Sequence, residues 1–83
     1  MQVADEVKTI LDDVLSLDGR ARAFDADTPL LGAIPELDSM AVVSLITAIE
    51  ERFGVEVADD EIDGSVFASF GSLVAFVERI SAQ

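Results

Sequence analysis

The chain lacks the side chains on which most enzyme active sites depend. Cysteine, histidine, tryptophan and tyrosine are all missing from its 83 residues. Without cysteine there is no disulfide framework, thiolate metal site or thiol nucleophile. Without histidine and tyrosine, the commonest general base and another catalytic acid are missing. We therefore expect no catalytic site in this chain.

Positive charge is also scarce: five Lys and Arg stand against 17 Asp and Glu, for a formal net charge of −12. Nucleic-acid phosphates and anionic membrane surfaces repel such a surface, so neither is an expected partner. The charge favours protein partners with basic patches, which electrostatic steering brings together quickly. The plainer interpretation, that the charge only keeps an apolar-rich protein soluble, stays open.

Targeting signals and long apolar runs are missing too. Residues 1–5 (MQVAD) are acidic, whereas a signal peptide begins with a basic region. The longest apolar-leaning run, residues 40–49, contains Ser44 and Thr47 and has half the length of a membrane span. We therefore expect a cytoplasmic protein with no membrane insertion.

What the chain has is enough apolar material for a core, since 51% of its residues are hydrophobic. Its length predicts one domain, residues 1–83, near the small end of what folds alone. A first helix is predicted by apolar residues at steps of three and four, and Asp18-Gly19 is a typical helix stop. The apolar stripe of this helix consists of Val3, Val7, Ile10, Leu11, Val14 and Leu17.

Residues 20–37 show neither helical nor strand periodicity, and Pro29 and Pro35 prevent a regular helix. A connection longer than the ~12–15 residues usual in compact domains indicates a function. Its apolar side chains predict an ordered loop held against the helices. They are Phe24, Leu30, Leu31, Ile34 and Leu37.

Two further helices are predicted beyond this loop. Asp38 is a favourable N-cap, so the second runs from Ser39 to about Phe53 and ends at Gly54. The last runs from 69 to about 81, and residues 59–63 suit one short turn of helix. Helical spacing places one set of apolar side chains of each helix on its inward face. In the second helix these are Val42, Leu45, Ile46, Ile49 and Phe53, and in the last they are Phe70, Leu73, Val74, Val77 and Ile80. The predicted fold is all-α, a small antiparallel helical bundle of three main helices plus one short helix, with a long ordered loop between the first and second helices.

The start of the second helix is a candidate site. Ser39 lies in its first turn, where unpaired backbone N–H groups and the helix dipole favour an anion. A phosphodiester on the Ser39 hydroxyl would lie in that field, which is worth roughly 0.3–1 kcal/mol at an exposed position. On its own, however, an Asp38-Ser39 helix start is more often only a cap.

The outward face of the second helix combines apolar and acidic residues. Helical geometry turns Met40, Val43, Ser44, Thr47 and Glu51 away from the core, with Glu50 flanking them. Glu50 and Glu51 lie near the helix C-terminus, where the dipole disfavours carboxylates. A local rule broken without visible compensation indicates function. We interpret this surface as a docking face, a small apolar spot bordered by acidic residues.

The string Leu37-Asp38-Ser39-Met40, followed by residues 49–55 (IEERFGV), resembles the acyl carrier protein family. That family carries Asp-Ser-Leu at the start of its second helix and then an acidic helix end that closes on a Phe. The resemblance covers nearly the whole chain, including the order of its elements, its size and its negative charge.

The resemblance implies a carrier, as in fatty acid biosynthesis, rather than an enzyme. A phosphopantetheinyl transferase would move 4′-phosphopantetheine from coenzyme A onto Ser39, beside Asp38 and Met40. The terminal thiol of this arm would hold an acyl group as a thioester. The docking face of Met40, Val43, Thr47, Glu50 and Glu51 would meet basic patches on acyl-loading and acyl-transferring enzymes. We expect a monomer whose acyl chain lies against residues such as Leu45 or Ile62.

Some residues depart from the family pattern. Met40 replaces the usual Leu, Ala41 and Ser44 stand where carriers of fatty acid synthesis tend to be acidic, and residues 64–69 form a slightly longer stretch. These departures favour a specialised lipid, polyketide or exopolysaccharide-associated pathway. Residues 32–40 are similar to carriers found with bacterial exopolysaccharide and exosortase systems.

Three alternatives remain. A peptidyl or aminoacyl carrier shares the serine at the helix start. An acidic helical adaptor would carry no prosthetic group. A calcium-binding module is suggested by Asp59, Glu61, Asp63 and Gly64 at positions 1, 3, 5 and 6 of an EF-hand-like loop, but position 12, which needs a Glu, is Phe70. We therefore expect no metal site.

Overall fold

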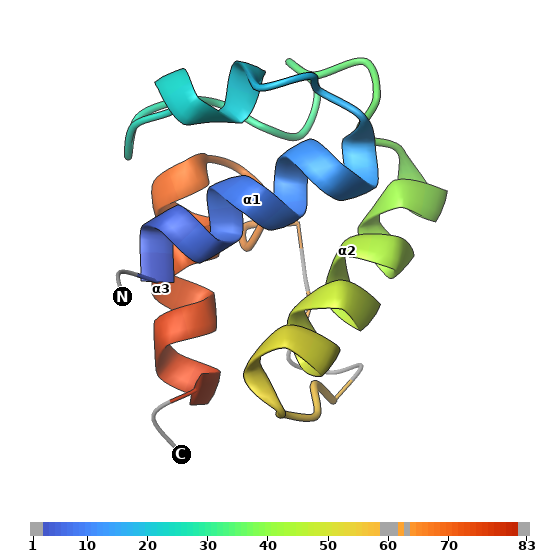
Figure 1. Cartoon of the computed structure of the whole chain (residues 1–83), viewed down its shortest axis with the longest axis vertical. Coiled ribbons are helices and arrows are strands. Elements are labelled where there is room, and N and C mark those ends of the chain that lie inside the picture. The colour runs from blue at the N-terminus through green and yellow to red at the C-terminus, as the bar shows by residue number, and fades with distance from the viewer. Residues whose placement is uncertain (1–2, 59–61, 63, 82–83) are drawn as a thin grey trace.

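A computed structural model describes residues 3–58, 62 and 64–81. It contains α1 (Val3–Leu15), the 3₁₀ helix η1 (Arg20–Ala23), α2 (Ser39–Phe53) and α3 (Phe70–Ser81). α1 lies across α2 and α3 and packs against both, while η1 lies along the middle of α1, where the Ala21 N–H donates to the Asp12 carboxylate (Figure 1). The predicted all-α helical fold is confirmed. The short helix predicted at 59–63 falls largely on residues 59–61 and 63, which lie outside the described residues.

The first helix ends earlier than predicted. Ser16 takes a left-handed conformation (φ 55°), and the Leu17 N–H donates to the Asp12 carbonyl (3.1 Å), which closes α1 at Leu15. This is the bonding of a Schellman cap, formed here by serine instead of the usual glycine. Leu17 is still buried, but beyond the helix rather than on its stripe. Gly19 (φ 89°) instead introduces η1, which the missing periodicity gave no reason to predict.

The long loop is ordered, as predicted, although one of its expected core contacts is wrong. Leu30 and Leu37 are buried, and Phe24 and Ile34 pack partly buried against the core. Leu31 is 47% exposed. Successive side chains of an extended segment point to opposite sides, so the burial of Leu30 turns Leu31 outward.

Backbone hydrogen bonds join this loop to the start of α3. The N–H groups of Leu30 and Leu31 donate to the carbonyls of Ala68 and Phe67, and the N–H of Phe70 donates to the Thr28 carbonyl. We call these two bonded segments, residues 26–31 and 67–71, the loop–α3 junction. Its last bond runs from the Gly71 N–H to the Ala26 carbonyl (3.0 Å), where a Cβ on residue 71 would lie 2.7 Å from that oxygen. The junction fixes the loop and therefore the approach to α2.

The core consists of apolar side chains, and no polar or charged side chain is buried within the described part of the chain. α3 begins at Phe70 rather than Ser69, because Ser69 acts as its cap: Ser69 and Ser72 exchange bonds from backbone N–H to side-chain hydroxyl, each 3.1 Å long. Phe76, absent from the predicted inward set, is 5% exposed, and Val74 is only partly buried.

Among the described residues, no helix has both the length and the apolar character needed to cross a membrane.

Candidate functional site

The bounds of α2 agree with the prediction, because both of its ends are set by local signals. Asp38 is extended (φ −116°, ψ −174°), and its carboxylate accepts the Ala41 N–H at 2.9 Å. The Asp38 carbonyl accepts the Val42 N–H at 2.9 Å. At the other end, Gly54 is left-handed (φ 65°) and its N–H donates to the Glu50 carbonyl. Asp38 therefore determines where the helix begins and which way the next side chain points.

Ser39 is the first residue of α2, and it is exposed. Its hydroxyl therefore has room for a large substituent, and the unpaired N–H groups and positive dipole end of the helix favour a negatively charged one. No histidine, cysteine or tyrosine exists in the chain to activate this hydroxyl. Asp38 is committed to the cap. The arrangement suits a serine that another protein modifies, and one phosphodiester fits it sterically and electrostatically.

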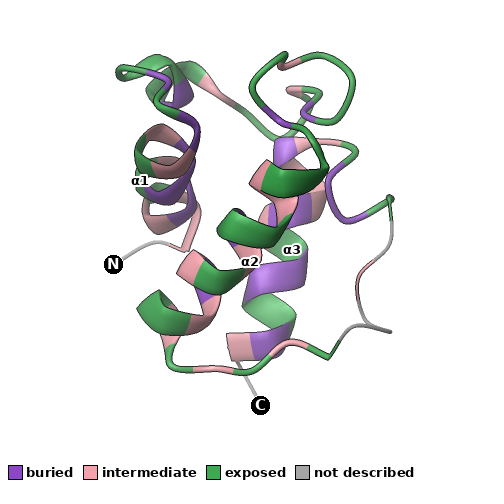
Figure 2. Ribbon diagram, turned by 90° about the vertical axis from the view of Figure 1, so that its right-hand side faces the viewer, coloured by how far each residue is buried: buried purple, intermediate pink, exposed green. Residues whose placement is uncertain are grey.

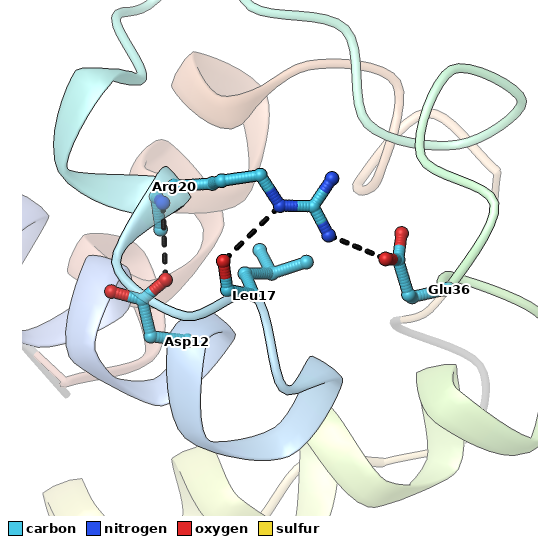
Figure 3. A network of polar contacts seen from close by, with 5 residues as sticks. Asp12, Leu17, Arg20 and Glu36 are labelled. Carbon is cyan, nitrogen blue, oxygen red and sulfur yellow. Dashed lines mark hydrogen bonds and ion pairs between the residues drawn. The ribbon is translucent and has the colours of Figure 1, made fainter.

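A polar network fixes the segment that enters this helix (Figure 3). The Arg20 side chain donates to the Leu17 carbonyl (3.1 Å) and forms an ion pair with Glu36, three residues before Ser39. The Asp12 carboxylate accepts the Ala21 N–H at 3.0 Å, which holds η1 against α1. The hydrogen bond from Arg20 lowers the pKa of the Glu36 carboxyl. Sequence reasoning missed this role of Arg20, because the two partners are far apart in the chain and neither lies in a periodic pattern.

The outward face of α2 is exposed along much of its length (Figure 2). Met40 is 75% exposed and Val43 is 61% exposed, which is unusual for large apolar side chains on one helix face. Thr47 and Glu51 are exposed on the same face, and the Thr47 hydroxyl donates to the Val43 carbonyl (3.1 Å). The structure thus places Met40, Val43, Thr47 and Glu51 on one face of the helix that begins at Ser39, as expected from helical spacing.

Glu50 differs from the other members of the predicted docking face. It is only partly exposed, and its carboxylate accepts the Val57 N–H at 2.8 Å. The unfavourable position of this carboxylate at the helix C-terminus therefore has a compensating hydrogen bond, which the sequence did not reveal. The argument that Glu50 breaks a local rule without compensation is wrong.

A partly apolar hollow of about 400 Å³ lies beside α2. Val57 and Ile62 line it together with one stripe of α2, which consists of Val42, Val43, Ile46, Thr47 and Glu50. Leu45, the other residue named as a contact for a bound chain, is fully buried in the core. The hollow thus combines side chains of the outward face with Ile62 of the segment that follows α2.

The opposite flank of α2 is tied to α1. Arg52 forms an ion pair with Glu6, whose side chain is only 13% exposed. The hydrogen bond to Glu6 raises the pKa of the Arg52 guanidinium. Arg52 is the only basic residue of α2, and this pairing directs its charge toward α1.

Within the described residues, no group of three or more acidic side chains is arranged to hold a metal ion. The EF-hand-like positions Asp59, Glu61 and Asp63 lie outside the described residues.

The chain is similar over nearly its whole length to proteins of one family. The family model for a phosphopantetheine attachment site matches residues 5–80. An acyl carrier protein of Sinorhizobium fredii is 37% identical over 81 residues, which cover 96% of both chains. One of Helicobacter acinonychis is 30% identical over 79 residues, or 94% of both chains. The solution structure of a holo acyl carrier protein from Nitrosomonas europaea aligns with a TM-score of 0.87, at 53% identity and over 95% of each chain.

Proposed function

Because this chain belongs to the acyl carrier protein family, we propose that Ser39 is the residue to which its 4′-phosphopantetheine is attached. The observation that supports this assignment is the exposed Ser39 hydroxyl at the capped start of α2, inside the region matched by the family model. Family members are carriers, not enzymes, so the chemistry of loading and transfer belongs to partner proteins. When bound, the group supplies a terminal thiol that this cysteine-free chain lacks.

The residues around Ser39 position the arm. Asp38 holds the first turn, so the attachment oxygen projects from a fixed point at the helix end. The N–H groups of this turn stabilise the phosphodiester charge. Met40 lies next to the attachment point and is open to solvent, where it can contact both the arm and a partner.

The docking face meets enzymes that carry basic patches. Its apolar spot, Met40 and Val43, offers surface to bury, and the acidic residues around it speed encounter with a basic partner. Glu51 is exposed and belongs to this acidic border, whereas Glu50 lies at the edge of the hollow. The phosphopantetheinyl transferase and the acyl-handling enzymes would use this same face in turn.

The acyl chain of the loaded carrier lies in the hollow beside α2. Support comes from the apolar side chains that line it, among them Ile46, Val57 and Ile62. Ile62 was an expected contact for a bound chain, and it is one of these lining residues. We place the carrier in a specialised lipid, polyketide or exopolysaccharide-associated pathway, on the basis of Met40, Ala41 and Ser44.

One experiment tests the attachment site. The protein is incubated with coenzyme A and a broad-specificity phosphopantetheinyl transferase, and its intact mass is recorded. We expect one phosphopantetheine on the wild type and on Ser44→Ala, an exposed serine of the same helix, and none on Ser39→Ala. An unmodified wild type, or a modified Ser39→Ala protein, would refute the proposal. Identifying the acyl group on protein isolated from its native cell distinguishes an acyl carrier from an aminoacyl carrier.

A second experiment tests the docking face. Glu51→Lys reverses one charge on this face, whereas Glu78→Lys makes the same change at an exposed position of α3. Because steering acts on the rate of association, Glu51→Lys should slow arm attachment at low salt and have less effect at high salt. Equal rates for the two variants at low salt would contradict the proposed docking face.

A further inference from the structure

Along α2, the residues that line the hollow follow one another away from Ser39, and Glu50 is the last of them. Glu50 lies eleven positions after Ser39, which corresponds to about 16 Å along the helix axis. Of the described α2 residues that line the hollow closer to Ser39, Val42, Val43 and Ile46 are apolar and Thr47 is polar but uncharged. Glu50 is therefore the one charged side chain among the described lining residues, and on α2 it is the lining residue farthest from the attachment point.

Three hydrogen bonds hold the chain after α2 against Glu50. Its carbonyl accepts the N–H groups of Gly54 and Val55, and its carboxylate accepts the Val57 N–H at 2.8 Å. Val57 itself lines the hollow. The side chain of Glu50 thus fixes the position of a second wall as well as contributing its own charge.

The chemistry of this end disfavours a hydrocarbon chain. Each methylene that moves from water into the apolar part of the hollow stabilises the loaded protein. A methylene pressed against Glu50 would instead remove water from an ionised carboxylate, which is unfavourable without a new partner. Displacing the carboxylate would leave the Val57 N–H without its acceptor.

We propose that Glu50 is a specificity-determining residue that closes the far end of the hollow and so limits the length of acyl chain this carrier can shelter. The substrate class is short- and medium-chain acyl groups, whose ends stop before the carboxylate. This inference rests on the proposed function, because it requires an arm on Ser39. It assigns Glu50 a role distinct from that of Glu51, whose side chain does not line this hollow.

The test uses a series of acylated carriers. A broad-specificity transferase loads the protein from acyl coenzyme A derivatives whose saturated chains increase from four to fourteen carbons in steps of two. Intact mass first confirms that each chain is attached. The midpoint of thermal unfolding is then compared with that of the unacylated holo protein. We expect the midpoint to rise with chain length up to a limit and to rise no further beyond it.

Three substitutions of Glu50 assign that limit, with Glu78→Ala, outside both the docking face and the hollow, as the matched control. Glu50→Ala removes the wall and should lengthen the limit by two or more carbons. Glu50→Asp withdraws the carboxylate by one methylene and should lengthen it less, which keeps the test decisive if the alanine variant does not fold. Glu50→Gln retains an acceptor for the Val57 N–H but removes the charge, so it should lengthen the limit less than Glu50→Ala does. Glu78→Ala, at an exposed position of α3 away from the hollow, should keep the wild-type limit.

Each contrary outcome has a defined meaning. If Glu50→Ala and Glu50→Asp keep the wild-type limit, or if Glu78→Ala shifts it equally, the role of Glu50 is overturned. If no chain raises the midpoint of the wild type, the hollow does not shelter the chain and the inference also fails. If no chain can be attached at all, the failure is that of Ser39 as the attachment site, and mass spectrometry shows this before any midpoint is measured.

Discussion

Asp38→Ala is the substitution that tests most directly how the fold presents Ser39. The change removes the carboxylate that accepts the Ala41 N–H at 2.9 Å and leaves the first turn of α2 without its side-chain partner. Replacing an N-cap Asp by Ala costs about 1 kcal/mol of stability. For a domain of this size, that loss lowers the unfolding midpoint by about 4–8 °C. Asp38→Asn keeps a side-chain oxygen at the same place and should stay much closer to the wild type.

The same two variants connect stability with function. If the transferase needs an intact first turn of α2, a substitution that destabilises this turn by about 1 kcal/mol slows arm attachment at most about fivefold. Circular dichroism gives the midpoints, and intact mass spectrometry over time gives the attachment rates. An Asp38→Ala protein as stable as the wild type would refute the capping argument. A loss of attachment in Asp38→Asn without a loss of stability would show that the transferase requires the charge itself.

Two further predictions concern the segments that support the site. Gly71→Ala should lower the unfolding free energy by roughly 1–3 kcal/mol, because the new Cβ would lie 2.7 Å from the Ala26 carbonyl oxygen. Gly64→Ala, with open space around it, should not destabilise the protein in this way. Equal thermal unfolding midpoints for the two variants would contradict the close approach at Gly71. The Arg20–Glu36 pair lowers the pKa of Glu36 below its ordinary value of 4.5, so its stabilisation is present above that pH and is lost as the pH falls through the lower folded-state pKa. Denaturant unfolding of Glu36→Gln and wild type should therefore show a small difference at neutral pH that disappears in acid, and a constant difference would argue against the ion pair.

Local signals made α2 predictable from the sequence. An Asp before the helix and a Gly after it each satisfy backbone groups within a few residues, so the bounds follow from neighbouring residues alone. The exposure of Met40 and Val43 follows from helical spacing in the same way. The sequence did not predict the end of α1, because the left-handed residue that closes the helix is Ser16. Glycine usually takes this position, so the helix was expected to continue to Gly19.

Features that depend on contacts across the chain could not be predicted in this way. The exposure of Leu31 depends on which side of an extended loop faces the core, and two adjacent leucines give no preference. The partner of Glu50 lies seven residues away, beyond the end of its helix. The pairing of Arg20 with Glu36 spans 16 residues of irregular chain.

The loop–α3 junction also has a consequence for how the protein opens. Its backbone bonds connect Ala26, Thr28, Leu30 and Leu31 with residues 67–71. These amides should exchange with deuterium together, as one cooperative unit. The hollow beside α2 is lined by Val57 and Ile62, neither of which takes part in a junction bond. A separation of α2 from that segment would therefore break none of the junction bonds, so we predict that an acyl chain in the hollow enters and leaves while the junction amides stay protected from exchange.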